Sequence, residues 1–149
     1  DGGHGNLPCA GISADAGAAL AALDGQPVTL VTQGSFEDSR AENLLATVAG
    51  RGPELVVLSA HIDGHDLAQS AIDNASGLAC ALAVAEALRD IVPALPRGMQ
   101  VGLFNIEEWA LLGSAAHLAN MDDAERTRRV LNVNLDSVAG EAGLTALTS

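Results

Sequence analysis

Three apolar runs constrain the fold of this chain more than any other feature of its sequence. The runs occupy residues 54–60, 98–106 and 130–135. Strands that carry apolar side chains on both faces are typical of parallel sheets with helices on each side. An Ala- and Leu-rich segment at helical spacing, 74–91, separates the first two runs, and two shorter helical segments, 111–120 and 122–129, precede the third. The alternation predicts an α/β fold: a three-layer αβα arrangement around a mostly parallel, mixed central sheet.

Further elements are expected upstream of these runs. Ser13 is a suitable N-cap for an Ala- and Leu-rich helix that extends to Leu23. Strands are predicted at residues 8–12, 27–32 and 42–49. The chain does not begin with Met, and it stops soon after a strand-like segment. We therefore expect a fragment with an incomplete sheet and unpaired strand edges.

The charge balance argues against two classes of partner. The chain has 19 acidic and 7 basic residues, which gives a formal net charge of −12. Nucleic acids and anionic membrane surfaces attract Lys and Arg, so neither is an expected partner. No uninterrupted apolar stretch of about 18 residues occurs, so no membrane-spanning helix is predicted. Cys9 and Cys80 are too few for a disulfide framework, and Cys80 is expected to be a small buried residue on the inner side of a helix.

One imidazole and five carboxylates stand at the ends of the predicted strands or at the mouth of the helix between them. His61-Ile62-Asp63 follows the first apolar run, Glu107-Glu108 follows the second and Asp136 follows the third, while Asp73-Asn74 opens the helix. Ligands of open α/β sheets bind at the carboxyl ends of the strands. Carboxylates gathered there repel one another unless cations lie among them. The set therefore indicates a site for two divalent metal ions.

Simpler interpretations explain single members of this set but not the whole. His61 and Asp63 lie on the same side of an extended chain, which alone would suit a surface pair, and Asp73 alone would suit a helix N-cap. Glu107 and Glu108 are harder to explain, because unpaired charges at the end of a buried strand are costly. In a metal site, one glutamate binds an ion and its neighbour accepts a proton from the attacking water.

Two other histidines lie near these motifs. His65 is interpreted as a loop residue close to the substrate and is kept as a reserve ligand. His117 lies in the middle of the helical segment 111–120 and is interpreted as structural.

The ordered set of motifs resembles the M28 zinc peptidases, a group of co-catalytic aminopeptidases and their relatives. The matching segments are His61-Ile62-Asp63, Asp73-Asn74-Ala75-Ser76-Gly77, Glu107-Glu108 with Leu112-Gly113-Ser114 behind it, and Asn134-Leu135-Asp136. The resemblance covers residues 42–140 and implies a fold of the zinc-peptidase (phosphorylase/hydrolase-like) type. It also implies that residues 33–149 are the N-terminal part of the catalytic domain, truncated at its C-terminus. Residues 1–32 resemble the tail of a protease-associated insert domain.

The resemblance implies a role for each motif residue. The implied zinc ligands are His61 on the first ion, Asp73 between the two ions, and Glu108 and Asp136 on the second. Glu107 would be the general base and later the general acid, and Asp63 would hold His61. The metals would polarise the scissile carbonyl and lower the pKa of the water between them. The Asp73–Asn74 peptide bond is often cis in the family. A second histidine usually binds the first zinc, and this chain stops before any matching residue.

The implied activity is that of a zinc-dependent exopeptidase with two co-catalytic Zn²⁺ ions and a peptide substrate. The form Asp73-Asn74-Ala75-Ser76-Gly77 is more typical of the aminopeptidase branch. A carboxypeptidase-like M28 enzyme and a metal-free receptor or interaction homologue of the same fold are the open alternatives. The family and the insert-domain segment imply a secreted or periplasmic location. The residues predict no oligomeric state, and the fragment alone is expected to be inactive.

Overall fold

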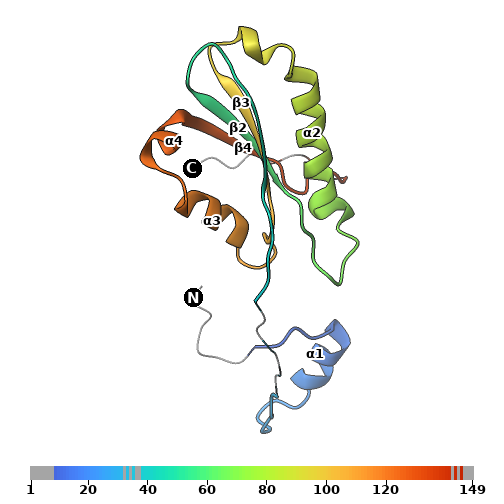
Figure 1. The fold of residues 1–149 in the computed structure, drawn as a ribbon. Helices are drawn as coiled ribbons and strands as arrows, with labels where there is room; N and C mark the ends of the chain where they lie inside the picture. Colours follow the sequence, from blue (N-terminus) through green and yellow to red (C-terminus); the bar gives the residue numbers. More distant parts are fainter. Residues whose placement is uncertain are drawn as a thin grey trace. The chain divides into compact units, whose positions relative to one another are not determined.

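The computed structural model describes residues 9–31, 33, 35, 38–141, 143 and 145, in two units, Asp1–Ser39 and Arg40–Ser149. The first unit contains helix α1 (Ala14–Ala21; Figure 1). The Ser13 hydroxyl accepts the N–H of Ala16 at 3.2 Å, which confirms the predicted helix and its N-cap. Residues 9–12 and 27–31 form no strand, so the strands predicted at 8–12 and 27–32 are not found in the described residues.

A mixed sheet forms the centre of the second unit (Figure 1). Its strands are β1 (Leu44–Val48), β2 (Leu55–His61), β3 (Gly98–Phe104) and β4 (Arg129–Asn134), in the spatial order β1-β3-β2-β4. Strand β2 pairs in parallel with β3 and β4, whereas β1 runs antiparallel to β3. The three parallel strands are the three apolar runs of the sequence, so the α/β class and the mostly parallel, mixed sheet are confirmed.

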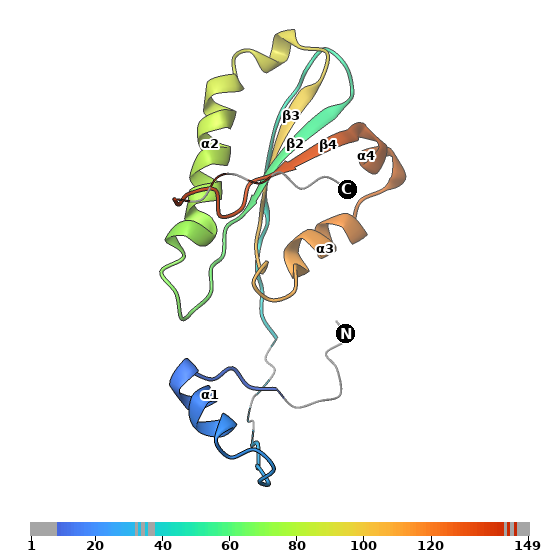
Figure 2. The same ribbon diagram turned by 180° about the vertical axis from the view of Figure 1, so that it is seen from behind.

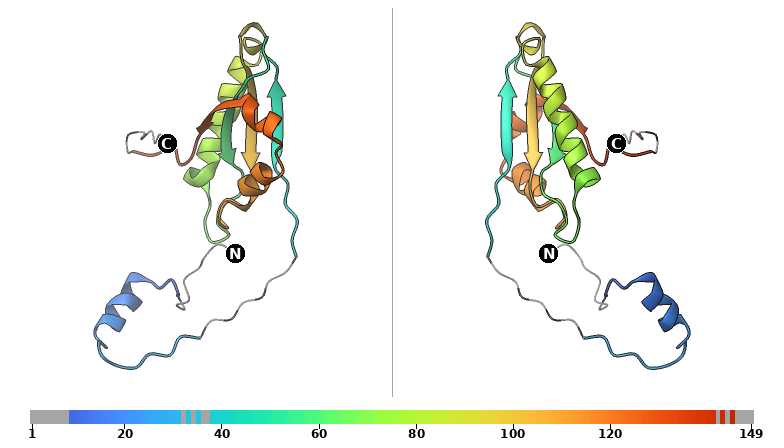
Figure 3. Two further views of the ribbon diagram at one scale, coloured as in Figure 1. Left: turned by 90° about the vertical axis from the view of Figure 1, so that its left-hand side faces the viewer. Right: turned by 90° about the vertical axis from the view of Figure 1, so that its right-hand side faces the viewer.

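Helices lie on both faces of this sheet. After β2 the chain passes through a loop and the irregular helical turn η1 (Ala71–Ser76) into α2 (Gly77–Leu88), which lies along one face (Figure 2). A short 3₁₀ helix, η2 (Val92–Ala94), then leads to β3. Helices α3 (Leu112–Ala119) and α4 (Asp123–Arg128) lie on the other face, between β3 and β4 in the sequence (Figure 3). The layers follow the predicted αβα arrangement.

The apolar core lies between the sheet and α2. It consists of buried residues from two strands and one helix: Leu58, Ala60, Val101, Leu103 and Ala81. Side chains alternate along a strand, so Ser59 and His61 face the opposite side of β2 from Leu58 and Ala60. The core therefore positions the end of β2 so that His61 faces away from α2.

Helix α2 differs from its prediction at its start and in one buried residue. The regular helix begins at Gly77 rather than Asn74, because Asp73 and Asn74 have non-helical backbone angles. The peptide bond between these two residues is cis. Cys80 is exposed, and the expectation that it is buried was wrong. Ala81 is the residue that faces the sheet, and Cys80 lies about 100° around the helix from it.

Within the described residues, the helical stretch Ala71–Leu88 is long and apolar enough to cross a membrane, with a mean hydropathy of 1.3 over 18 residues. The sequence prediction did not include it, because Asp73 interrupts the apolar run. Leu78, Ala81 and Ala85 pack against the core of the sheet. We therefore interpret the stretch as the helix that covers this face.

Candidate metal centre

His61 is the last residue of β2 and is only 4% exposed. Beneath it on the same face, the hydroxyl of Ser59 approaches Asn134 Oδ1 at 2.8 Å and Asn132 Oδ1 at 2.9 Å, and can donate to either. These contacts link β2 to β4, the strand that leads to Asp136. The two strand ends that carry candidate ligands are therefore joined through side chains as well as through the backbone ladder.

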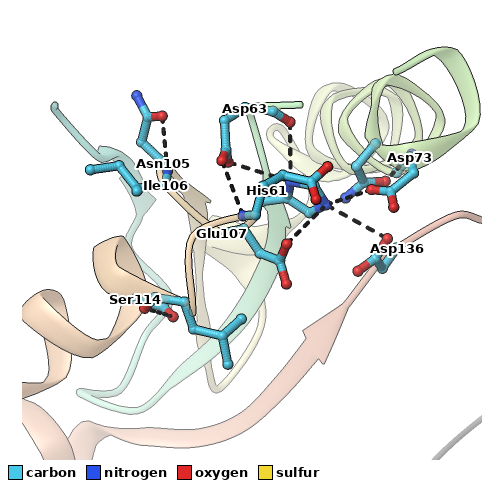
Figure 4. A network of polar contacts seen from close by, with 12 residues as sticks. His61, Asp63, Asp73, Asn105, Ile106, Glu107, Ser114 and Asp136 are labelled. Carbon is cyan, nitrogen blue, oxygen red and sulfur yellow. Dashed lines mark hydrogen bonds and ion pairs between the residues drawn. The ribbon is translucent and has the colours of Figure 1, made fainter. Parts of the chain in front are cut away.

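Four carboxylates surround the imidazole ring of His61 (Figure 4). Its Nε2 atom lies 3.0 Å from Asp73 Oδ1, 3.7 Å from Asp136 Oδ1 and 4.0 Å from Glu107 Oε2. Asp63 lies at the other ring nitrogen, with Oδ1 3.4 Å from Nδ1. The structure therefore brings together five of the six residues that the sequence predicted for the site.

Asp63 contacts both His61 and the glutamate pair. The backbone carbonyl oxygen of Asp63 lies 3.1 Å from His61 Nδ1, and its Oδ2 accepts the backbone N–H of Glu108 at 3.2 Å. A proton on Nδ1 would leave the lone pair of Nε2 available to a metal ion. In the described part of the chain, no ion pair joins the Glu108 carboxylate to His61.

The electrostatics of the cluster favour an added positive charge. Burial by itself lowers the pKa of His61, but Glu107, Asp136, Asp73 and Asp63 outweigh it and raise this pKa above 6.5. Burial is the largest effect on Glu107 and raises its pKa. His61 lowers this pKa and the neighbouring carboxylates raise it, so that the pKa of Glu107 lies above its ordinary 4.5. Both groups therefore hold protons more tightly than usual. A bound cation would supply the same charge in place of a proton.

The donor set fits a zinc ion. His61 Nε2 is buried and has no hydrogen-bond partner among the described residues, since the close contact with Asp73 is not aligned as a hydrogen bond. Ligand atoms of His61, Asp73 and Asp136 all lie within 4.8 Å of one another. Tetrahedral zinc ligands at ~2.1 Å from the ion lie roughly 3.4 Å apart, so these three groups can converge on one ion with small movements.

The carboxylates are less buried than the sequence suggested. The side chains of Asp73 and Asp136 are 56% and 41% exposed, and that of Glu107 is 31% exposed. The imidazole and the Asp63 side chain, at 3% and 15% exposed, are the more enclosed groups of the cluster. A cation and a substrate can therefore approach the cluster from the solvent side.

His65 and His117 lie outside the cluster. The half-exposed ring of His65 lies 3.3 Å from Asp66 Oδ1 and accepts the N–H of Leu67. His117 lies in α3 with its ring centroid 5.4 Å from that of Phe104. This contact supports the structural interpretation of His117.

Asn74 has a structural role that its sequence position did not reveal. Its side chain is 1% exposed and forms hydrogen bonds with the backbone of Leu135 and Ser137, about sixty residues away in the sequence. The sequence signal was a polar residue directly after a candidate ligand at a helix entrance. An ordinary N-cap gives the same signal.

Known proteins resemble this chain in both sequence and structure. Residues 43–147 match the family described as peptidase family M28. Leucine aminopeptidase 2 of Trichophyton equinum is 31% identical over 137 residues, which cover 89% of this chain and 27% of that protein. A probable lipoprotein aminopeptidase of Mycobacterium tuberculosis is 26% identical over 134 residues, covering 89% of this chain and 26% of its own length.

A solved structure, that of a zinc aminopeptidase from Bacillus subtilis, superposes with a TM-score of 0.61 at 28% identity. The superposition covers 64% of this chain and 24% of that one. The chain thus spans about a quarter of the length of these proteins.

Proposed function

Because this chain belongs to peptidase family M28, we propose that it carries most of the metal centre of a zinc-dependent aminopeptidase. The observation that carries the proposal is the convergence of His61, Asp73 and Asp136, whose ligand atoms lie within 4.8 Å of one another. The relatives named as a leucine aminopeptidase and as a zinc aminopeptidase support it. The substrate is then a peptide with a free N-terminal amino group.

We assign the ligands to two zinc ions by their distances. His61 Nε2 and Asp136 Oδ1 lie 3.7 Å apart, so both would hold the same ion, together with Asp73. This differs from the sequence-based expectation, which grouped Asp136 with Glu108 on the other ion. Asp73 would be shared between the two ions, and Glu108 would hold the second ion.

The proton transfers fall to Glu107. When bound, the zinc ions would lower the pKa of a water molecule and polarise the scissile carbonyl. Glu107 lies next to the ligand cluster with 31% of its side chain exposed, so a water molecule can reach its carboxylate. Ionised Glu107 accepts a proton from the attacking water and afterwards returns it to the leaving amine.

Two alternatives make different predictions. A carboxypeptidase-like member of the family would bind zinc but release C-terminal residues. A metal-free receptor or interaction homologue would bind no zinc, and a chelator would leave its melting temperature unchanged. The Nε2 atom of His61, which has no hydrogen-bond partner among the described residues, favours a metal-binding protein.

We also propose an extracytoplasmic location and an insert-domain origin for residues 1–32. The name of one relative, a lipoprotein aminopeptidase, supports the location. Residues Asp1–Ser39 form a unit of their own. The curated relatives match 89% of the chain, more than the segment 43–147 that defines the family, so their similarity includes part of this unit.

Hydrolysis of leucine p-nitroanilide by the natural full-length protein tests the proposed activity. N-acetyl-leucine p-nitroanilide is the matched control, because it lacks the free amine. We expect p-nitroaniline to be released only from the substrate with a free amine. A chelator should abolish this activity, and added zinc should restore it. A zinc-containing protein that releases nothing would indicate carboxypeptidase-like specificity. A protein with neither activity nor zinc would not be an enzyme of this kind.

A further inference from the structure

The buried side chain of Asn74 connects the two segments that carry Asp73 and Asp136. Its Nδ2 donates to the carbonyl oxygen of Leu135 at 3.0 Å. Its Oδ1 accepts the N–H of Ser137 at 3.2 Å and the N–H of Gly77 at 3.0 Å. Leu135 and Ser137 are the two neighbours of Asp136 in the sequence. One amide therefore holds the backbone on both sides of one ligand, while its own backbone continues directly from the other.

From this arrangement we infer that Asn74 is a positioning residue that sets the separation of the Asp73 and Asp136 carboxylates at the metal centre. The inference rests on the proposed zinc site. Both carboxylates approach His61 Nε2, at 3.0 Å and 3.7 Å, so their mutual placement decides whether three ligands can reach one ion. Asn74 itself is 1% exposed, and in the described part of the chain its side-chain hydrogen bonds go to Leu135, Ser137 and Gly77 rather than to His61.

The sheet alone does not hold Asp136. The N–H of Leu135 donates to the carbonyl oxygen of Ser59 at 2.8 Å, which is the last backbone hydrogen bond from this segment to β2 among the described residues. Ser137 then has φ of 51°, in the left-handed region, so the chain turns away from the strand direction. The side-chain hydrogen bonds of Asn74 to Leu135 and Ser137 follow directly after the last backbone hydrogen bond between β2 and this segment. They hold the backbone on both sides of Asp136.

Gly77 supports the same interpretation independently. A Cβ atom at this position would lie 2.2 Å from Asn74 Oδ1 and 2.2 Å from the carbonyl oxygen of Leu135. Real Cβ atoms essentially never approach other atoms this closely. The first residue of α2 must therefore be glycine for the amide of Asn74 to reach Leu135.

Removing the amide should loosen the metal centre before zinc binds. In Asn74→Ala the backbone groups of Leu135, Gly77 and Ser137 lose their shared partner, and the Asp136 segment is free to move. Residues that orient metal ligands typically contribute about 10- to 100-fold to metal affinity. We expect the Kd for zinc to rise by about that factor, because the ligands must be ordered at the moment of binding.

The test measures the zinc Kd of the natural full-length protein by competition with a chromophoric chelator, and the Tm with and without zinc. Asn74→Ala and Gly77→Ala are compared with two matched controls. Gln100→Ala removes another buried amide, which bonds Thr47 and Arg129 in the middle of the sheet. Gly50→Ala introduces a Cβ 2.4 Å from the backbone of Arg97, at the sheet edge opposite the metal centre.

The two test variants should bind zinc more weakly and gain less Tm on zinc addition, whereas both controls should lower Tm equally with and without zinc. A folded Asn74→Ala protein with an unchanged zinc Kd would overturn the positioning role and leave the proposed function intact. A wild-type protein that binds no zinc would instead overturn the proposed function. If Asn74→Ala does not fold, Asn74→Ser, whose hydroxyl leaves a smaller cavity, is judged by the same Kd criterion.

Discussion

Replacing Glu107 by Gln separates proton transfer from metal binding. Glu107 Oε2 lies 4.0 Å from His61 Nε2, beside the three ligands that converge within 4.8 Å but not among them. Gln has nearly the same shape, but its amide cannot take a proton from water at neutral pH. A positioned general base contributes about 10²- to 10⁴-fold to the rate, which corresponds to roughly 3–5 kcal/mol of transition-state stabilisation. We expect kcat to fall by about that factor while the zinc content stays unchanged.

Glu108→Gln is the matched control, because it makes the same chemical change one residue later. Its carboxylate is assigned to the second zinc ion, so this variant should lose zinc and recover activity when zinc is added in excess. The assay is the initial rate of leucine p-nitroanilide hydrolysis at several zinc concentrations, with the zinc content measured on the same samples. A Glu107→Gln protein that keeps more than about a tenth of the wild-type kcat, or whose kcat is restored by excess zinc, would contradict the role of Glu107 as general base.

Three further substitutions test other parts of the structure. Asp63→Asn removes the carboxylate beside His61 Nδ1 and should weaken zinc binding about 10- to 100-fold, measured by competition with a chelator. An unchanged zinc affinity would show that Asp63 does not orient His61 for metal binding. Leu58→Ala opens a cavity beneath α2, where Leu58 is 6% exposed, and should lower the free energy of unfolding in urea by about 2–5 kcal/mol without changing zinc affinity. A negligible loss would mean that Leu58 does not anchor the core. Burial and, to a smaller extent, Arg129 lower the pKa of His117 below its ordinary 6.5, so the folded state disfavours protonation of this ring. The stability contribution of the neutral ring is complete above pH 6.5 and is lost as the pH falls from there through the lowered folded-state pKa. His117→Gln should therefore flatten the pH dependence of urea unfolding over this range, and a variant as pH-sensitive as the wild type would speak against this cause.

The sheet and most of the site could be predicted because both depend on local patterns. The apolar runs specify strands, and the parallel topology then brings the residues after each run to one end of the sheet. His61, Glu107 and Asp136 meet for this reason, although they lie far apart in the sequence. Strands β2 and β3 are buried as expected, but the expectation that the third run is covered on both faces was wrong, because β4 is the exposed strand at the edge of the sheet.

The remaining features depend on contacts that no local pattern contains. The helix was predicted to start at Asn74, but this residue leaves the helical conformation and bonds to Leu135 and Ser137. The inner face of α2 was also ambiguous, because Ala and Leu occur all around this helix. Leu82 is 49% exposed, whereas Ala81 is fully buried in the core beside the sheet. The proximity of Asp136 to His61 likewise required the register between β2 and β4.

Anomalous diffraction at the zinc edge, from crystals of the natural full-length protein, is the most direct test of the proposed metal centre. The account predicts two zinc peaks, one of them ~2.1 Å from His61 Nε2 and shared with the carboxylates of Asp73 and Asp136. Zinc-loaded crystals with no peak at His61, or with peaks bound only by other residues, would contradict it.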